Sequence, residues 1–308
     1  MLSGYTFSEL LSIFTMQGFA GLSLFSVFLL MALGLAVIFG QMGVINMAHG
    51  EFMILVAYTT YVTSNLFQAY APGLFSFYFF VAVIVSFFVA GALGAFIEWA
   101  VIRHLYSRPL DTLLATWGLS LILQQVYRSI FGAKEVTVIL PDWMMGALQV
   151  TDSIEIPING LIVLILTLMV TIFMWVVMFR SRLGISLRAV VLNRPMAGAV
   201  GINTAFVDRV TFSFGCGIAG IAGCAFTMIG STGPTAGQLY IVDTFLVVVF
   251  GGAGTLIGTV CSAFGIAQAQ SVMEFFMSGS MAKVITLLIV VGILMIRPQG
   301  LFAVKVRK

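Results

Sequence analysis

Long apolar stretches follow one another along almost the whole chain, and they constrain its fold more than any other feature. The stretch from Phe77 to Ile102, for example, contains a single charged residue, Glu98. A helix of about 20 apolar residues spans the roughly 30 Å hydrocarbon layer of a bilayer. Transmembrane β-strands would instead appear as shorter segments of alternating apolar and polar residues. The pattern therefore predicts an all-α membrane protein.

Composition excludes a large soluble domain. The chain of 308 residues is 61% hydrophobic and only 8% charged, and its mean hydropathy is +1.14. Soluble domains carry about 25% charged residues. So few charges cannot cover a water-facing surface, and the protein must be surrounded largely by lipid.

We expect a polytopic helical bundle of about eight to ten transmembrane segments, some of them broken or re-entrant, in a single transmembrane domain, residues 1–308. The seventh expected segment is short and rich in glycine, so it is a candidate half-helix. The expected segments are Phe19–Gly40, Gly50–Phe67, Phe77–Ile102, Thr112–Ile130, Ile158–Phe179, Val207–Ile229, Thr244–Gly258, Thr259–Met277 and Met281–Ile296.

A weak internal repeat of two halves is a further hypothesis. GLAVIFGQMGVINMAHGEFMILVAY and CAFTMIGSTGPTAGQLYIVDTFLVVVF both pass from one apolar segment through a glycine-rich polar break into another. Many transporters are built from such repeats, and their substrate path lies at the broken helices. Chance similarity between two apolar segments is the alternative.

Lysine and arginine residues in short loops predict the orientation, because they favour the cytoplasmic side. On one side lie Arg103, Arg108, Arg180, Arg182, Arg188, Arg194, Arg209, Arg297, Lys305, Arg307 and Lys308. The opposite loop, residues 132–157, carries Lys134 and the acidic residues Glu135, Asp142, Asp152 and Glu155. We therefore expect an external N-terminus, an external loop at residues 132–157 and a cytoplasmic C-terminus. Lys283 lies on the wrong side in this topology.

The break between the first two segments concentrates glycine and polar residues. They are Gly40, Gly43, Asn46, His49, Gly50 and Glu51. Asn46 is suited to cap a helix, and Glu51 suits the positive end of one. We interpret the stretch as a hinge at the cytoplasmic end of the path, in which the glycines permit the turn and His49 holds a neighbouring element. A tight turn that only caps itself is the alternative.

Polar residues inside the apolar segments suggest a substrate path. Thr116, Ser120 and Gln124 are spaced by four and share one face of a helix. Such a stripe either lines a pore or hydrogen-bonds to a neighbouring helix. The candidate path residues are Thr116, Trp117, Ser120, Gln124, Gln238 and Gln268.

The basic segment at residues 180–209 is a candidate coupling element for a cytoplasmic partner. Asn193 can cap a helix with Pro195 in its first turn, so two short helices are expected to meet there. The candidate coupling residues are Arg188, Asn193, Arg194, Pro195 and Gly201. A helix that lies on anionic lipid is the alternative.

Motifs for catalysis are missing from the sequence. There is no GxxxxGK[ST] nucleotide motif, no Cys/His metal cluster and no nucleophile–base–acid set. A lone His49 beside a lone Glu51 is a poor metal set, because zinc sites use three or four protein ligands. We therefore expect a transport protein rather than an enzyme, with no metal or cofactor held by this chain and no nucleic acid partner.

Four motifs resemble the permease subunits of ABC importers for branched-chain amino acids and their relatives. They are GVINMAHGEFM, RAVVLNRPMAGAVGIN, VVFGGAGTLIGT and the closing RPQGLF, and the resemblance covers essentially the whole chain. RPLDTLLATWGLSLILQQ and GPTAGQLYIVDTFLVVVFGGAG look most like the urea-transporting branch, specifically its B-type permease.

This resemblance implies the rest of a transport machine in the bacterial inner membrane. A second, homologous permease would pair with this chain within membrane lipid. Two cytoplasmic ATPase subunits would bind ATP and Mg²⁺ and dock on the coupling segment, and a periplasmic binding protein would deliver the cargo. Urea is the expected cargo. A branched-chain amino acid or related amide is the alternative, and a passive small-solute channel is a third hypothesis.

Overall fold

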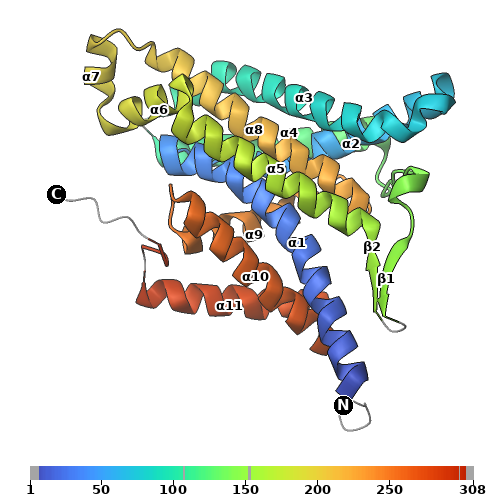
Figure 1. The fold of residues 1–308 in the computed structure, drawn as a ribbon. Helices are drawn as coiled ribbons and strands as arrows, with labels where there is room; N and C mark the ends of the chain where they lie inside the picture. The colour runs from blue at the N-terminus through green and yellow to red at the C-terminus, as the bar shows by residue number, and fades with distance from the viewer. Residues whose placement is uncertain (1–6, 107, 152–153, 298, 303–308) are drawn as a thin grey trace.

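The computed structural model describes residues 7–106, 108–151, 154–297 and 299–302. It is almost entirely helical (Figure 1). The α-helices are α1 Phe7–Met42, α2 His49–Tyr70, α3 Tyr78–Ala100, α4 Pro109–Phe131, α5 Ile158–Arg180, α6 Arg182–Leu192, α7 Arg194–Ala199, α8 Thr204–Ile229, α9 Ala236–Gly251, α10 Leu256–Phe276 and α11 Gly279–Ile296. Short 3-10 helices occupy Pro72–Phe77, Ile102–His104 and Asp142–Met144, and a hairpin pairs β1 (Ala147–Thr151) with β2 (Ile154–Pro157).

Helices α1 and α8 form the centre of the bundle. In Figure 1, α3, α5 and α8 lie on one side of α1, and α10 and α11 lie on the other. Small residues let the central helices approach closely. A Cβ atom added to Gly34 of α1 would lie 2.4 Å from the carbonyl oxygen of Gly215 on α8. One added to Gly223 would lie 2.0 Å from that of Met53 on α2. These contacts fix α1, α2 and α8 as one packed unit.

The expected membrane architecture is confirmed, because each expected segment corresponds to one long helix. Six of the described spans are long and apolar enough to cross a membrane, and they contain α1, α3, α5, α8, α10 and α11. Helices α2 and α4 are as long but carry more polar side chains, and α9 is shorter. The protein is therefore a multi-pass membrane protein.

Three predicted boundaries are wrong: the start of the first segment, since α1 begins at Phe7 instead of Phe19, and both ends of the seventh segment. The seventh segment was expected at Thr244–Gly258, but α9 begins at Ala236 and ends at Gly251. The glycine-rich run lies instead in the turn to α10, where Gly252 and Gly254 have positive φ angles of 94° and 90°. The polar break that precedes α9 is correspondingly short and ends at Thr235. The backbone N–H of Gln238 already donates to the carbonyl oxygen of Thr235.

Basic residues collect at one end of the bundle. This end holds α6, α7 and the junction of α3 with α4, and the β-hairpin lies at the opposite end (Figure 1). The arrangement agrees with the predicted orientation, which stays a prediction. Lys305, Arg307, Lys308 and Asp152, which contributed to it, lie outside the described residues. Lys283, which lies on the wrong side in the predicted topology, is within α11 and pairs with Asp243 of α9.

Candidate functional site

The chain reverses direction after α1 and returns into the bundle. Gly43 makes the turn with a φ of +68°, a backbone conformation that favours glycine. Nε2 of His49 then lies 3.2 Å from the carbonyl oxygen of Met31. Met31 precedes the end of α1 at Met42 by about 16 Å of helix, at 1.5 Å per residue. Helix α2 therefore begins deep in the bundle, and the hinge at the cytoplasmic end of the path stays a prediction.

Glu51 faces the polar stripe of α4. Its Oε1 atom accepts hydrogen bonds from the Ser120 hydroxyl at 3.0 Å and from Nε2 of Gln124 at 2.9 Å. The hydroxyl of Tyr127 donates to the backbone carbonyl of Glu51 at 2.9 Å, and the Thr116 hydroxyl accepts from the backbone N–H of Met47 at 3.1 Å. The stripe predicted from the sequence is thus one buried face, and its partner is the returning chain.

The predicted cap of α2 by Asn46 is wrong, whereas Glu51 lies in the first turn of the helix as predicted. The residue that precedes α2 is Ala48, and its side chain makes no cap. The Asn46 side chain accepts instead from the backbone N–H of Ala48 at 3.1 Å, which closes the turn before the helix. Glu51 bonds with α4 rather than with the first donors of its own helix. Sequence position alone could not reveal α4 as the nearer partner.

The start of α2 and the buried stripe of α4 meet at a junction. Three buried polar atoms beside it lack a hydrogen-bond partner among the described residues. They are Oε2 of Glu51, Nδ2 of Asn46 and Nδ1 of His49. Glu51 is only 1% exposed. Buried polar groups are normally paired, and ionisable groups within a membrane are costly and mark functional sites. The junction can therefore accept an N–H donor on Glu51 and offer a donor from Asn46.

Helix α9 begins beside α2. A Cβ atom added to Gly50 would lie 2.2 Å from the carbonyl oxygen of Gly237, so the two helix starts touch. The break before α9 is also held by paired backbone hydrogen bonds between Val136 and Thr232. Helices that start within the bundle are the usual setting of substrate sites in transporters.

The structure does not bring the six predicted path residues together. Trp117 is 51% exposed on another face of α4 than the buried stripe. Gln268 of α10 donates to the carbonyl oxygen of Gly18 at 3.1 Å and ties α10 to α1. Gln238 is half-buried in the first turn of α9. Their roles in transport stay predictions.

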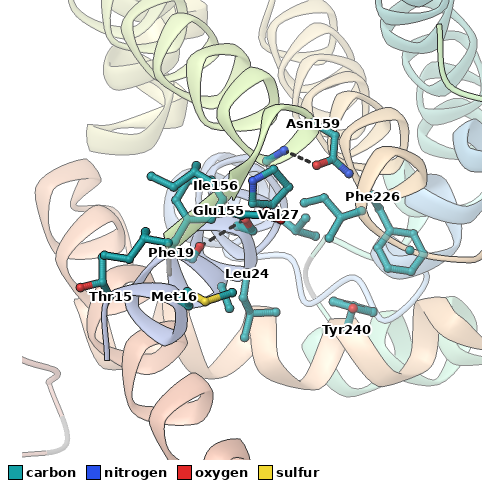
Figure 2. Close-up of a pocket in the computed structure, with 17 residues that line it drawn as sticks. Thr15, Met16, Phe19, Leu24, Val27, Glu155, Ile156, Asn159, Phe226 and Tyr240 are labelled. Atoms are coloured by element: carbon teal, nitrogen blue, oxygen red, sulfur yellow. Dashed lines mark hydrogen bonds between the residues drawn. The ribbon is translucent and has the colours of Figure 1, made fainter. Parts of the chain in front are cut away.

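A second feature is an apolar chamber at the end of the bundle that holds the β-hairpin (Figure 2). Its volume is about 520 Å³. The N-terminal part of α1, β2 and the facing ends of α5 and α8 form its walls, and Tyr240 of α9 also lines it. Figure 2 labels these lining residues: Thr15, Met16, Phe19, Leu24, Val27, Glu155, Ile156, Asn159, Phe226 and Tyr240. The chamber suits an aliphatic group.

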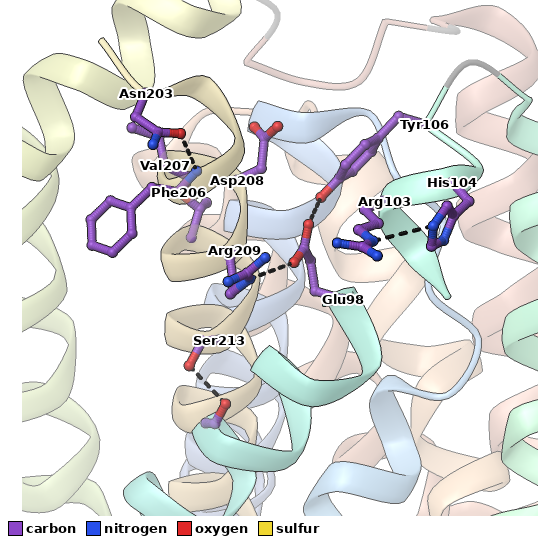
Figure 3. A network of polar contacts seen from close by, with 12 residues as sticks. Glu98, Arg103, His104, Tyr106, Asn203, Phe206, Val207, Asp208, Arg209 and Ser213 are labelled. Atoms are coloured by element: carbon purple, nitrogen blue, oxygen red, sulfur yellow. Dashed lines mark hydrogen bonds and ion pairs between the residues drawn. The ribbon is translucent and has the colours of Figure 1, made fainter. Parts of the chain in front are cut away.

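A polar network joins helices at the opposite end (Figure 3). Glu98 of α3 accepts from the Tyr106 hydroxyl at 2.8 Å and from Nε of Arg209 on α8 at 3.1 Å. Burial, then the hydrogen bond to Glu98, raises the pKa of Tyr106 above its usual range. Tyr106 therefore remains a donor at neutral pH. The network locks α3 to α8.

The coupling segment forms two short helices, as predicted. The Asn193 side chain accepts from the backbone N–H of Met196 at 3.0 Å, with Pro195 in the first turn of α7. Gly201 follows α7 with a φ of +88°.

The two arginines of this segment that were expected to face a partner contact their own chain. Arg188 donates to the carbonyl oxygen of Met178 and stacks on Phe179, and Arg194 pairs with Asp208. The exposed side chains of the segment are mainly apolar: Ile185, Val191, Leu192, Met196 and Val200. Both arginine side chains are long enough to contact α5 or α8 of their own chain, and the sequence does not show these contacts.

No metal site is visible in the described part of the chain. It contains no group of three or more His, Cys, Asp or Glu side chains that could hold a metal ion.

These features define a multi-pass membrane transport subunit with broken helices inside its bundle. The family described as "Branched-chain amino acid transport system / permease component" matches residues 18–296, so the chain belongs to that family. It is a transport subunit and not an enzyme.

Relatives of known function carry the same description. The chain is 26% identical to the high-affinity branched-chain amino acid transport system permease protein LivH of Salmonella typhimurium over 303 residues, which cover 96% of this chain and 97% of the relative. It is 26% identical to BraD of Pseudomonas aeruginosa over 290 residues, 91% of this chain and 93% of the relative. A probable LivH of Methanocaldococcus jannaschii is 22% identical over 296 residues, 91% of this chain and 89% of the relative. No solved structure matches the chain.

Proposed function

We propose that this chain is one of two membrane subunits of an ABC importer in the bacterial inner membrane, and that its cargo is a branched-chain amino acid. The observation that carries the proposal is the buried junction where α2 and α9 begin beside the stripe of α4, in a chain of a branched-chain amino acid permease family. A periplasmic binding protein delivers the cargo. ATP binding and hydrolysis in two cytoplasmic subunits then change the shape of the path.

The cytoplasmic subunits dock on α6 and α7. The exposed apolar side chains Leu192, Met196 and Val200 support this, because a water-facing surface of that kind calls for a protein partner. Arg188 and Arg194 act as internal anchors that hold the two helices against α5 and α8. ATP and Mg²⁺ are bound by the docked subunits, and the second membrane subunit is a homologous permease.

Urea is a second candidate cargo. The segments that look most like the urea branch, RPLDTLLATWGLSLILQQ and GPTAGQLYIVDTFLVVVFGGAG, contribute α4 and α9 to the junction. Urea is small and neutral, and its N–H groups match the free Oε2 atom of Glu51. A passive channel would move the same solute without a docked ATPase.

Uptake by the complete transporter distinguishes these functions. We would reconstitute this chain with its partner subunits in proteoliposomes and measure entry of labelled leucine and labelled urea, each with ATP and with a non-hydrolysable analogue. ATP-dependent leucine uptake that excess urea does not inhibit is the expected result. ATP-dependent urea uptake alone would move the assignment to urea, and uptake independent of ATP would contradict the importer.

A further inference from the structure

Two opposite charges face each other between α9 and α11, away from the junction of α2, α4 and α9. Nζ of Lys283 on α11 lies 3.1 Å from Oδ2 of Asp243 on α9. Side-chain exposure is 34% for the lysine and 13% for the aspartate. Both residues lie within helices that contain no other charge. Charged pairs at such positions are costly and mark the paths of substrates or ions.

Tyr240 connects this ion pair to the apolar chamber. Nζ of Lys283 lies 5.2 Å from the centroid of the Tyr240 ring. Tyr240 precedes Asp243 by three residues, so both lie on one face of α9. The same ring lines the chamber, as Figure 2 shows, and packs edge-on against Phe226 with ring centroids 5.1 Å apart. One aromatic side chain therefore lies between the chamber and the two charges.

The chamber and the ion pair offer complementary chemistry. Leu24, Val27 and Phe226 give the chamber an apolar wall, and its volume of about 520 Å³ exceeds the space that one aliphatic side chain needs. Asp243 supplies an anion, and Lys283 supplies a cation that also lies over the Tyr240 ring. An aliphatic amino acid carries an apolar side chain, an ammonium and a carboxylate, and so matches all three parts. Urea carries no charge, so it has no charged group that could pair with Asp243 or Lys283.

We propose that Asp243 and Lys283 recognise the zwitterionic end of an aliphatic amino acid whose side chain occupies the chamber. The inference rests on the proposed amino acid cargo. When Tyr240 moves aside, the cargo ammonium donates to Asp243 and the cargo carboxylate accepts from Lys283. Each charge of the pair then exchanges one partner of opposite sign for another, and neither is left unpaired. A neutral solute cannot make this exchange.

The decisive variant is the neutral pair Asp243→Asn with Lys283→Gln. Two amides can still hydrogen-bond to each other, so α9 and α11 should stay together. We expect the assembled complex in nanodiscs to bind labelled leucine at least about tenfold more weakly, because hydrogen bonds to two charges are lost. The matched control neutralises the exposed pair Arg108–Asp111 by R108Q with D111N, and should bind leucine normally.

A charge swap tests the purely structural alternative. Asp243→Lys with Lys283→Asp restores an ion pair but reverses its direction relative to the chamber, so leucine binding should remain weak. Wild-type binding in either assembled variant would overturn the proposal. Failure of both variants to assemble would assign the pair to holding α11 and would also overturn it. If the wild-type complex itself neither binds nor imports leucine, the proposed cargo fails instead, before any variant is compared.

Discussion

Two buried glutamates, Glu51 and Glu98, differ in how completely they are paired. They are similarly buried, at 1% and 2% exposure. Both oxygens of Glu98 have partners, the hydroxyl of Tyr106 and the guanidinium of Arg209. Glu51 has only neutral partners, which share one oxygen, and its other oxygen has no partner among the described residues. A fully paired carboxylate holds helices together, whereas a half-paired one is available to a ligand.

The largest expected effect concerns the geometry that places Glu51. Gly50→Val should abolish both assembly and uptake, because the new side chain would meet the backbone of Gly237 and overpacking against backbone costs about 3 kcal/mol or more. Recovery of the complex by size-exclusion chromatography and uptake of labelled cargo would be measured together. Gly118→Val on α4 is the control, since a Cβ there meets nothing within 4 Å. Equal behaviour of the two variants would show that the close approach is unimportant.

The next effect separates the two glutamates by function. Glu51→Gln keeps an oxygen for Ser120 and Gln124 but replaces the free oxygen by an N–H donor. We expect normal assembly and uptake about tenfold lower, since a hydrogen bond to a charged group contributes about 1.5–3 kcal/mol. Uptake would be normalised to the amount of complex. Normal uptake would mean that the unpaired oxygen has no role in transport.

Replacing the other glutamate, Glu98, by glutamine should lower stability and leave uptake unchanged. Glu98→Gln loses the ion pair with Arg209, which is partly exposed, so the free energy of unfolding should fall by only about 1–2 kcal/mol. Thermal unfolding of the purified complex would show this as a lower Tm. Uptake per assembled complex should be unchanged. A loss of uptake without a change in Tm would place Glu98 with Glu51 as a functional group.

The smallest effect is expected on the lipid-facing side of α4. Trp117→Leu should alter stability by less than about 0.5 kcal/mol, because the ring is half exposed and an apolar residue replaces it. Uptake should match that of the wild-type complex. Ser120→Ala, four residues along the buried stripe from Thr116, is the contrasting variant, since it removes a donor to Glu51. Loss of uptake in Trp117→Leu would extend the path to this face.

The sequence predicted the helices and their faces but not their depth. Spacing by four identified Thr116, Ser120 and Gln124 as one stripe, and Asn193 correctly marked the start of α7. Hydropathy could not show that the chain returns along α1 to Met31, because a loop residue and a buried residue can have the same polarity.

Long-range partners also escaped the sequence. Lys283 lies on the wrong side of the predicted topology, and its partner Asp243, forty positions away, could not be identified from the sequence. Arg188 and Arg194 were predicted to lie in the interface with a cytoplasmic partner, yet both contact helices of their own chain. Spacing along one helix predicts neighbours on that helix, whereas contacts between helices depend on packing that no local pattern encodes.

The exposed apolar side chains of α6 and α7 affect how long an unassembled copy of the protein persists in the cell. Leu192, Met196 and Val200 are presented outside the lipid-facing helices, where a lone copy would expose them to water. Exposed apolar patches attract chaperones, proteases and other unassembled chains. We therefore expect surplus copies to be degraded, so that the scarcest subunit sets how many transporters a cell accumulates.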